Sequence, residues 1–214
     1  MSTVYTNVTV YVNIISVHRY NQTQSKIIST ALDLFLAHGI KKTTIEDVSE
    51  RCGITRATVY RYFQDKKDLV RASFMLMIDL TQEAIADLDK HKNYDTKKSA
   101  ERISQAINQL PKGDVPARVN ELKLLYPDIF NEYRDLRLSS IREIYKHVFE
   151  RAKKEGLLTP SEVNWDLMPA ILSEATVFIT ESPLVLSHGI AFRDIYSAMI
   201  DLMLYGVMSR RKKS

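Results

Sequence analysis

The chain has 214 residues, 45% of them hydrophobic, with only six glycines and six prolines, which argues against a wholly disordered chain and favours helices. Its formal net charge of +4 is small, so the position of the charge matters more than its sum. The single cysteine, Cys52, excludes an internal disulfide framework and fits a reducing, cytoplasmic setting.

Neither a targeting segment nor a membrane span is expected. The first seventeen residues carry no Lys or Arg and no continuous apolar run, unlike a secretory signal. The most apolar later stretch, 190 to 208, is interrupted by Arg193, Asp194 and Asp201. We therefore expect an all-α protein that resides in the cytoplasm.

The first residues show a different pattern from the remainder. Residues 4 to 16 alternate in the manner of a β-strand, with valines on one side and mostly polar side chains on the other. A lone strand has no obvious sheet to join in a helical chain. We favour an N-terminal arm over 1–22 without fixed structure, or a misassigned start of the chain, and the alternative is a strand that pairs with a partner.

Two short helices are expected after this arm. The first runs from about 25 to 38, where apolar residues recur at helical spacing, and Gly39 offers a left-handed stop. The second is capped by Thr43 or Thr44 and ends at Gly53.

A third short helix, from near Thr55 to Phe63, is basic and aromatic. Val59 and Phe63 are four residues apart and are expected to face inward, with Ala57 at the edge. The polar residues are expected outside, with Tyr60 bordering both sides: Thr55, Arg56, Thr58, Arg61 and Tyr62. From Ile54 to Lys67 four basic residues face one acid, a net charge of +3. The three helices predict a helix-turn-helix unit.

Longer helices follow. Asp65 is an N-cap, Pro127 suits a first helical position, Asn164 is a plausible cap, and Pro183 is expected to stop a helix. The expected ranges are 66 to 90, 96 to 110, 115 to 125, 127 to 155, 164 to 181 and 190 to 208.

The last two of these helices are apolar nearly all round. A helix of this kind must be covered on two sides, and the simplest second cover is the same surface of another copy. We therefore expect a homodimer. The candidate interface residues are Phe178, Ile195, Met199, Leu202 and Met203.

The exposed side of the third helix suits double-stranded DNA. Arg56 can donate two hydrogen bonds to guanine, and Thr58 can bond a base or touch a thymine methyl group. The residues that suit phosphate oxygens are Thr44, Thr55, Tyr60, Tyr62 and Lys66. The alternative is that this basic face is simply solvated and that its aromatic residues belong to the core.

The stretch "IISTALDLFLAHGIKKTTIEDVSERCGITRATVYRYFQDKKDLV", residues 27 to 70, resembles the tetracycline-repressor (TetR) family of bacterial transcription regulators. The resemblance is carried by the Thr43-Thr44 pair, by Gly53, and by the linked patterns Val59-Tyr60-x-x-Phe63 and Lys66-x-x-Leu69. The remainder agrees only in the number and placement of its helices.

The resemblance implies a homodimer with a DNA-binding domain over 23–66, a helical regulatory and dimerisation domain over 67–209, and a basic tail over 210–214. By position, Arg56, Ala57 and Thr58 would approach bases, while Thr44, Tyr60, Tyr62 and Lys66 would contact phosphates. Such a regulator, expected to act as a repressor, would release a palindromic operator when a small molecule binds.

Two features depart from the family pattern. The arm is longer than usual, and only His18 and Arg19 make it basic, so no minor-groove role is assigned to it. Glu46 lies near the expected DNA surface, where it pairs with a neighbouring lysine or accepts a hydrogen bond from a cytosine amine.

A ligand pocket is expected inside the larger domain, because adaptable and amphipathic side chains suit cavities in helical bundles. The candidates are Met75, Ile78, Tyr126, Phe130, Tyr133, Arg137, Trp165 and Phe178. The competing interpretation is that these residues form the core, and that Arg137 lies at the surface instead of meeting an anionic ligand.

Two other classes of function were compared with DNA binding. The five histidines are scattered, and no metal-ligand spacing, phosphate loop or nucleophile motif occurs, so we expect no enzyme, no catalytic residue, no metal and no cofactor. A helical adaptor that binds only protein explains the apolar last helices but not the polar residues around Tyr60.

Overall fold

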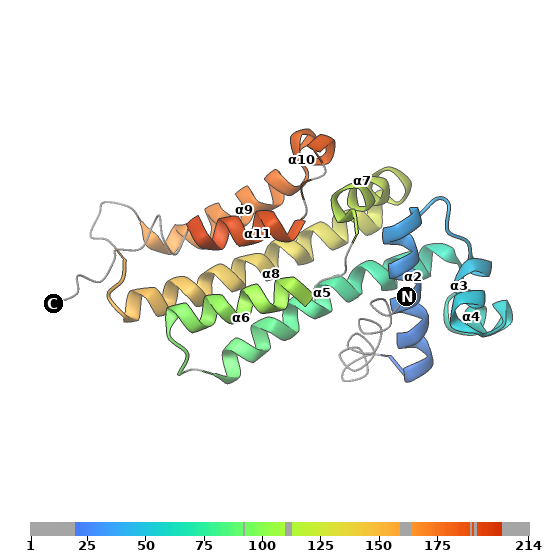
Figure 1. The fold of residues 1–214 in the computed structure, drawn as a ribbon, viewed down its shortest axis with the longest axis horizontal. Coiled ribbons are helices and arrows are strands. Elements are labelled where there is room, and N and C mark those ends of the chain that lie inside the picture. Colours follow the sequence, from blue (N-terminus) through green and yellow to red (C-terminus); the bar gives the residue numbers. More distant parts are fainter. Residues whose placement is uncertain are drawn as a thin grey trace. The chain divides into compact units, whose positions relative to one another are not determined.

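The computed structural model describes residues 20–91, 93–109, 113–158, 164–188, 190 and 192–202 (Figure 1). Every regular element in these ranges is a helix, which confirms the all-α fold class. The elements are α2 (Gln22–His38), α3 (Ile45–Cys52), α4 (Arg56–Tyr62), α5 (Lys66–Lys90), α6 (Thr96–Gln109), α7 (Val115–Leu125), α8 (Pro127–Lys154), η1 (Trp165–Leu167), α9 (Met168–Thr180), α10 (Pro183–His188) and α11 (Phe192–Asp201).

Three predictions lie outside the described residues. They are the N-terminal arm up to residue 19, the basic tail over 210–214, and Met203 at the expected dimer interface.

Local capping signals place most helix ends where the sequence predicts them. Asp65 accepts a hydrogen bond from the Asp68 backbone N–H at 2.8 Å at the start of α5. Asn164 accepts one from the Asp166 backbone N–H at 3.1 Å, although the first turn there is the 3-10 helix η1, not an α-helix. Gly156, with φ +66°, follows α8. Short side chains that satisfy free backbone groups therefore define these boundaries.

The helix before Pro183 ends at Thr180, one residue from the predicted end, and Pro183 begins a further short helix, α10, that the sequence did not predict. Ser182 accepts a hydrogen bond from the Val185 backbone N–H at 3.3 Å and so caps α10. Proline fits the first turn of a helix because its nitrogen carries no hydrogen that would need a partner.

The chain divides into two compact units. Unit 1 comprises the residues up to Leu80 together with Gln109–Tyr133, and unit 2 comprises Thr81–Asn108 and the chain from Arg134 onward. Both α5 and α8 contribute residues to each unit. Unit 1 is thus larger than the DNA-binding domain expected over 23–66, whose limits remain a prediction.

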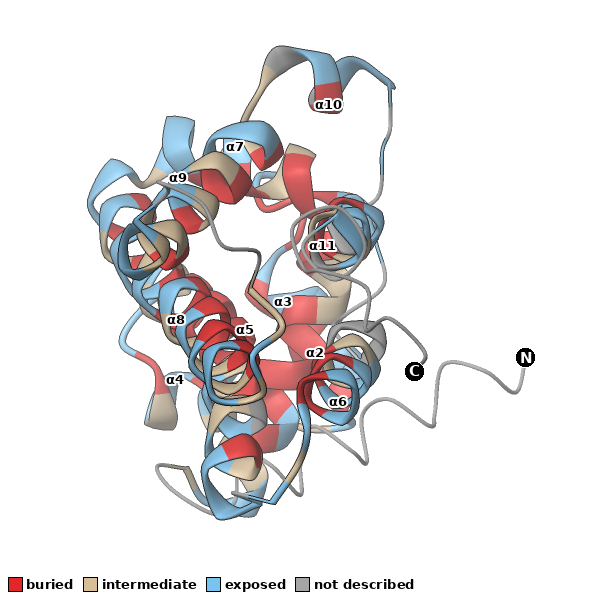
Figure 2. Cartoon of the chain, turned by 90° about the vertical axis from the view of Figure 1, so that its left-hand side faces the viewer, coloured by how far each residue is buried: buried red, intermediate tan, exposed pale blue. Residues whose placement is uncertain are grey.

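The core of unit 1 is built around the inner face of α2, where Ile27 and Leu32 are fully buried (Figure 2). Val59 of α4 and Leu69 of α5 are also fully buried. Apolar burial on this scale contributes about 1.5–3 kcal/mol per large side chain. The short helices α3 and α4 are therefore held by their neighbours and not by their own helix propensity.

The core of unit 2 contains the long helix α8, whose Val148 and Ala152 are fully buried. Polar contacts also occur inside this unit: the hydroxyls of Tyr145 and Thr176 lie 2.9 Å apart and link α8 to α9. Burial raises the pKa of Tyr145 to about 12, so its hydroxyl stays neutral and is able to donate a hydrogen bond.

None of the described helices combines the length and the apolar character that a membrane span requires.

Candidate nucleic-acid interface

Helix α3 is capped at both ends by its own sequence. The Thr44 side chain accepts a hydrogen bond from the Asp47 backbone N–H at 3.1 Å, and Asp47 accepts from the Thr44 backbone N–H at 2.7 Å. This reciprocal capping box lowers the pKa of Asp47, mainly through the backbone hydrogen bond from Thr44. At the other end Gly53 adopts the left-handed conformation with φ +66°, which turns the chain toward α4.

Helix α4 begins at a similar cap. Thr55 accepts a hydrogen bond from the Thr58 backbone N–H at 3.2 Å, and the two hydroxyl oxygens lie 2.9 Å apart. Val59 is fully buried and Phe63, the C-cap, is 3% exposed. The inward pair therefore fixes which side of this short helix faces solvent.

The outward side of α4 carries the polar groups that the sequence predicts there. Arg56, Ala57 and Arg61 are exposed, Tyr60 is 46% exposed, and Thr58 and Tyr62 are half-buried. The Arg61 guanidinium lies 5.0 Å from the centre of the Tyr62 ring and donates to the Tyr62 hydroxyl at 3.3 Å. Hydrogen-bond donors and a stacked cation are thus presented together on one helix face.

Glu46 of α3 contributes a negative charge to this surface. Its Oε2 lies 3.5 Å from Nη1 of Arg56, and both side chains are largely exposed. The sequence suggested a lysine or a cytosine amine as its partner, whereas the structure pairs it with the first residue of α4.

Four of the five predicted phosphate-contact residues have hydrogen-bond partners within the protein. Those of Thr55 and Tyr62 are Thr58 and Arg61. The Thr44 hydroxyl donates to Asp47 Oδ2 at 2.8 Å. The Lys66 ammonium donates to the Lys41 carbonyl oxygen at 3.3 Å, and burial lowers the pKa of Lys66 against the attraction of Glu121 and Asp47. A phosphate would have to compete with these contacts.

Glu121 of α7 holds the loop between α2 and α3 in place through hydrogen bonds to its backbone. Its carboxylate accepts hydrogen bonds from the backbone N–H groups of Ile40 at 2.9 Å and Lys41 at 2.8 Å, and from Arg118 at 2.7 Å. Burial favours the neutral acid, but these donors outweigh it and lower the pKa of Glu121. Gly39 beside them has φ +97°, and a Cβ there would lie 2.6 Å from Arg118 Nη1. The left-handed φ favours glycine at this position, whereas the end of the flexible Arg118 side chain could move away from a Cβ.

Two further ion pairs within unit 1 join α5 to α8. Lys67 Nζ lies 2.8 Å from Asp128, and Arg71 Nη2 lies 2.7 Å from Glu132. The start of α5 is therefore tied to the start of α8 on the same unit. Because these side chains are largely exposed, the pairs orient the helices more than they stabilise them.

The predicted pocket residues fall into different environments. Met75, Ile78, Phe130 and Tyr133 are buried in unit 1, and Tyr133 packs edge-on against Phe74 with ring centres 5.7 Å apart. Tyr126 is half-buried. These positions suit core packing as well as a cavity wall.

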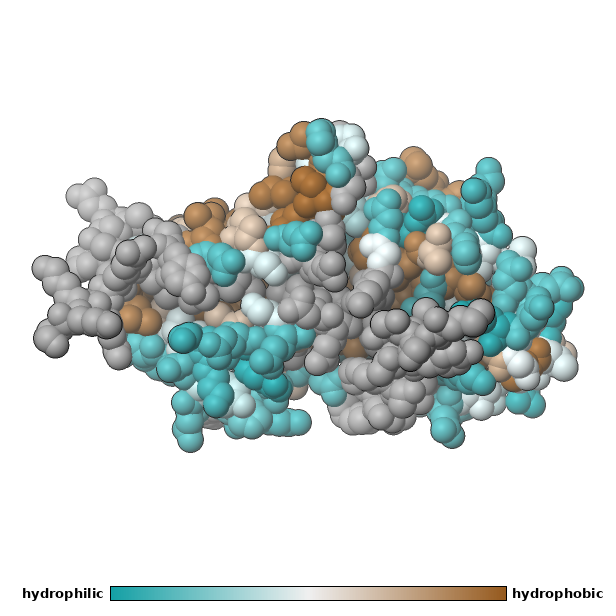
Figure 3. All heavy atoms as spheres, in the orientation of Figure 1, coloured by the Kyte–Doolittle hydropathy of each residue, from teal (hydrophilic) through white to brown (hydrophobic). Residues whose placement is uncertain are grey.

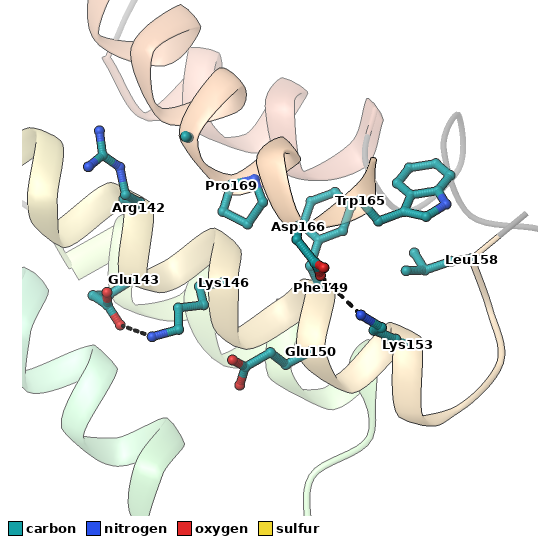
Figure 4. A pocket seen from close by; sticks show the side chains of 11 residues that line it. Arg142, Glu143, Lys146, Phe149, Glu150, Lys153, Leu158, Trp165, Asp166 and Pro169 are labelled. Carbon is teal, nitrogen blue, oxygen red and sulfur yellow. Dashed lines mark hydrogen bonds and ion pairs between the residues drawn. The ribbon is translucent and has the colours of Figure 1, made fainter. Parts of the chain in front are cut away.

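A cavity of about 390 Å³ lies elsewhere, between the second half of α8 and the start of α9 in unit 2 (Figure 4). Of the predicted pocket residues, only Trp165 lines it. Its rim is charged: Lys153 bonds Asp166 at 3.0 Å, and Lys146 lies 3.6 Å from Glu143. Among the described residues, no group of three or more His, Cys, Asp or Glu side chains is placed to hold a metal ion.

Arg137 is buried, although an arginine on a long helix is more often at the surface. It donates to the Thr180 hydroxyl and to the Tyr196 hydroxyl, the latter at 3.4 Å, and lies 3.9 Å from Glu181. Its side chain therefore joins α8 to α9 and α11. The surface alternative for Arg137 was wrong, because buried hydroxyl and carboxylate partners on neighbouring helices compensate its charge.

Two residues of the last helices lie differently from their predictions. Phe178 is 77% exposed, so within one chain it does not line an enclosed cavity and only its interface assignment remains. Ile195 is 8% exposed, which places it in the core of unit 2 and not on a surface for a second copy. Met199 is half-buried and Leu202 is 56% exposed.

The predicted interface residues did not include most of an exposed apolar surface on α9 and α10. Leu167, Ile171 and Phe178 are exposed along η1 and α9, and Leu184 and Ile190 are exposed beyond them. Figure 3 shows apolar atoms gathered over α10 and the neighbouring part of α9. The spacing of positions 167, 171 and 178 in the sequence could have predicted this apolar face, since residues four and seven apart lie on the same side of a helix.

Comparison with known proteins identifies the first part of the chain. Residues 27–73 match the model of bacterial regulatory proteins of the tetR family. The transcriptional regulator TtgR of Pseudomonas putida is 26% identical over 132 residues, which cover 59% of this chain and 62% of that protein. The matched segment is thus shorter than two thirds of that relative.

Solved structures share the fold. A TetR-family transcriptional regulator from Streptomyces coelicolor has a TM-score of 0.57 at 15% identity, covering 90% of this chain and 93% of its own. SmeT, solved in complex with triclosan, has a TM-score of 0.58 at 17% identity, covering 89% and 94%. The family match shows that residues 27–73 are similar to the N-terminal domain of bacterial regulatory proteins of the tetR family, and the solved structures show that the chain shares their fold.

Proposed function

We propose that this protein is a transcription regulator that binds a palindromic DNA operator as a homodimer, represses, and releases the operator when a small molecule binds. The observation that carries the proposal is the outward face of α4, where polar groups stand over a buried Val59 and Phe63. A single helix of this kind fits the major groove of DNA.

Within this proposal the residues at the start of α4 read bases. Arg56 and Thr58 supply donors, and the exposed Ala57 allows close approach. Tyr60, Arg61 and Tyr62 bind phosphate oxygens on the groove wall, since phosphate contacts set the position of the helix without reading sequence. The remaining phosphate contacts are Thr44, Thr55 and Lys66, and those of Thr44 and Lys66 follow a rearrangement of their internal hydrogen bonds.

A dimer supplies the second reading helix. The exposed apolar residues Phe178 and Leu202, with the α9 face that includes Ile171, support a two-fold interface through the last helices. A two-fold dimer reads two half-sites about 34 Å apart or at a related spacing, so the geometry of the dimer controls affinity.

An effector acts by changing this geometry. Helix α5 contributes residues to both compact units, so a ligand that displaces it affects both. Shifting a two-state protein from 1:99 to 99:1 requires a difference in ligand affinity worth about 5.5 kcal/mol. The binding of triclosan by SmeT supports an effector-responsive protein.

Selection from a random duplex DNA library tests the proposal. The full-length protein should enrich a palindromic sequence, and its affinity for that sequence should fall steeply with salt because phosphate binding releases counterions. A helical adaptor that binds only protein would enrich no sequence and would show no such salt dependence, which would refute the proposal.

A further inference from the structure

An acid stands on the surface that the proposed function assigns to DNA. Glu46 is the second residue of α3 and Arg56 the first residue of α4, and Glu46 Oε2 lies 3.5 Å from Arg56 Nη1. The exposed fractions of the two side chains are 71% and 58%. An exposed ion pair contributes little to stability. Stability therefore does not explain why an acid lies on the surface that faces DNA.

The contact with Glu46 leaves free the donors of Arg56 that would bind guanine. A guanidinium has five N–H donors in a planar fork, and the contact with the carboxylate is at Nη1. The Nε and Nη2 groups still form a parallel pair of donors, which matches the O6 and N7 acceptors of guanine. The carboxylate thus restricts the rotation of Arg56 without occupying the donors that would read a base.

The same contact weakens the attraction of Arg56 for phosphate. An arginine alone is attracted to any phosphate, but an arginine paired with a carboxylate carries almost no net charge. Phosphate attraction is common to all DNA sequences, whereas a bidentate contact to guanine is not. Pairing therefore favours the specific complex over nonspecific ones.

Glu46 makes no hydrogen bond of the α3 capping box, and its only local role in that helix is that of an acid near the positive end of the helix dipole. The capping box of α3 is made by Thr44 and Asp47, so the helix keeps its cap when Glu46 is changed. Arg56 also lies in the first turn of α4, where the positive end of the helix dipole disfavours a cation, and Glu46 offsets this.

We propose that Glu46 is a positioning residue that sets DNA specificity by holding Arg56 in the orientation that reads guanine. This inference rests on the proposed DNA-binding function and adds to it a selection against phosphate-only binding.

The test compares Glu46→Gln with Glu50→Gln, which makes the same charge change on an exposed residue one turn further along α3. Dissociation constants are measured for the selected operator and for all single-base variants of one half-site. Arg56→Ala identifies the base pair that Arg56 reads. At this base pair Glu46→Gln should reduce discrimination about fivefold or more, while Glu50→Gln stays within about twofold of the parent protein.

A double-mutant cycle separates positioning from a direct base contact. In an Arg56→Ala background, Glu46→Gln should cause no further loss of discrimination at that base pair. Circular dichroism and thermal unfolding of each variant verify that α3 and α4 remain folded.

Three results would overturn the inference: equal effects of Glu46→Gln and Glu50→Gln, a Glu46→Gln effect that persists without Arg56, or no base pair sensitive to Arg56→Ala. Each of them leaves the proposed function intact if the parent protein still selects an operator. Failure of the parent protein to select any sequence is a distinct outcome, and it refutes both.

Discussion

The helix-turn-helix of unit 1 and the last helices of unit 2 differ in how they use apolar residues. In α4 and its C-cap the two large apolar side chains, Val59 and Phe63, are buried, and the polar side chains are exposed or half-buried. In α9 and α11, apolar residues occur on both sides, so Phe178 is exposed while Ile195 is buried. A helix with one apolar stripe has one possible orientation, but a helix with two requires knowledge of its neighbours.

The same truncation in the two regions should change the stability of the chain by very different amounts. Phe63→Ala removes a buried ring and should lower the free energy of unfolding by about 3–5 kcal/mol. Phe178→Ala removes an exposed ring and should change the stability of the single chain by less than about 0.5 kcal/mol. Urea unfolding at low protein concentration measures both, and a comparable loss for Phe178→Ala would mean that its ring is buried.

A charged residue introduced on the exposed apolar surface should dissociate the proposed dimer. Phe178→Asp or Leu202→Asp would bury an unpaired carboxylate at the proposed interface, so the dimer should weaken by about 3 kcal/mol, or more than a hundredfold in Kd. Sedimentation at several concentrations measures this. Asp201→Asn, a change at an exposed neighbour of Leu202, is the control, and a full dimer in both aspartate variants would remove this surface from the interface.

Loss of the Glu121 carboxylate should loosen unit 1. Glu121→Ala leaves the N–H groups of Ile40 and Lys41 without their charged acceptor, which should cost about 2 kcal/mol. Folding lowers the pKa of Glu121. The stabilisation by its carboxylate is therefore fully present above the pKa of the unfolded chain and is lost as the pH falls through the pKa of the folded protein. Hydrogen exchange at Ile40 and Lys41 should accelerate in the variant, and unchanged exchange would show that the loop does not depend on Glu121.

Arg56→Ala should affect DNA binding and leave folding unchanged. The loss of operator affinity is expected to be about 1–3 kcal/mol, concentrated at one base pair. Gel-shift titration against the selected operator measures it, with Glu50→Gln as a surface variant of α3. An operator affinity equal to that of the parent protein would show that Arg56 takes no part in reading the site.

The smallest expected effect concerns Asp33 of α2. Burial raises the pKa of its carboxyl to about 6, against the opposing attraction of Arg51. Because the folded state holds the proton more tightly than the unfolded one, stability decreases as the pH rises from about 4 to 6. Since Asp33 is only half-buried, we expect Asp33→Asn to stabilise the chain by about 1 kcal/mol at pH 7, with the gain vanishing below about pH 4. A gain that is independent of pH in urea unfolding would contradict this.

How far the sequence predicts the site depends on the distance over which each feature is encoded. The caps at Thr44 and Thr55 are local, and the structure has both. The Glu121 contact joins residues about 80 positions apart, and no local pattern signals it. Glu46 is an intermediate case, because its place near the reading face was visible while its arginine partner was not.

The sequence by itself determined the all-α class, most helix ends and the inward pair of α4, since capping and apolar spacing act within a few residues. Tertiary structure alone decided that Arg137 is buried, that Ile195 belongs to the core and that Phe178 does not. The reason is physical: burial depends on what lies opposite a side chain, and that is set by helices distant in sequence.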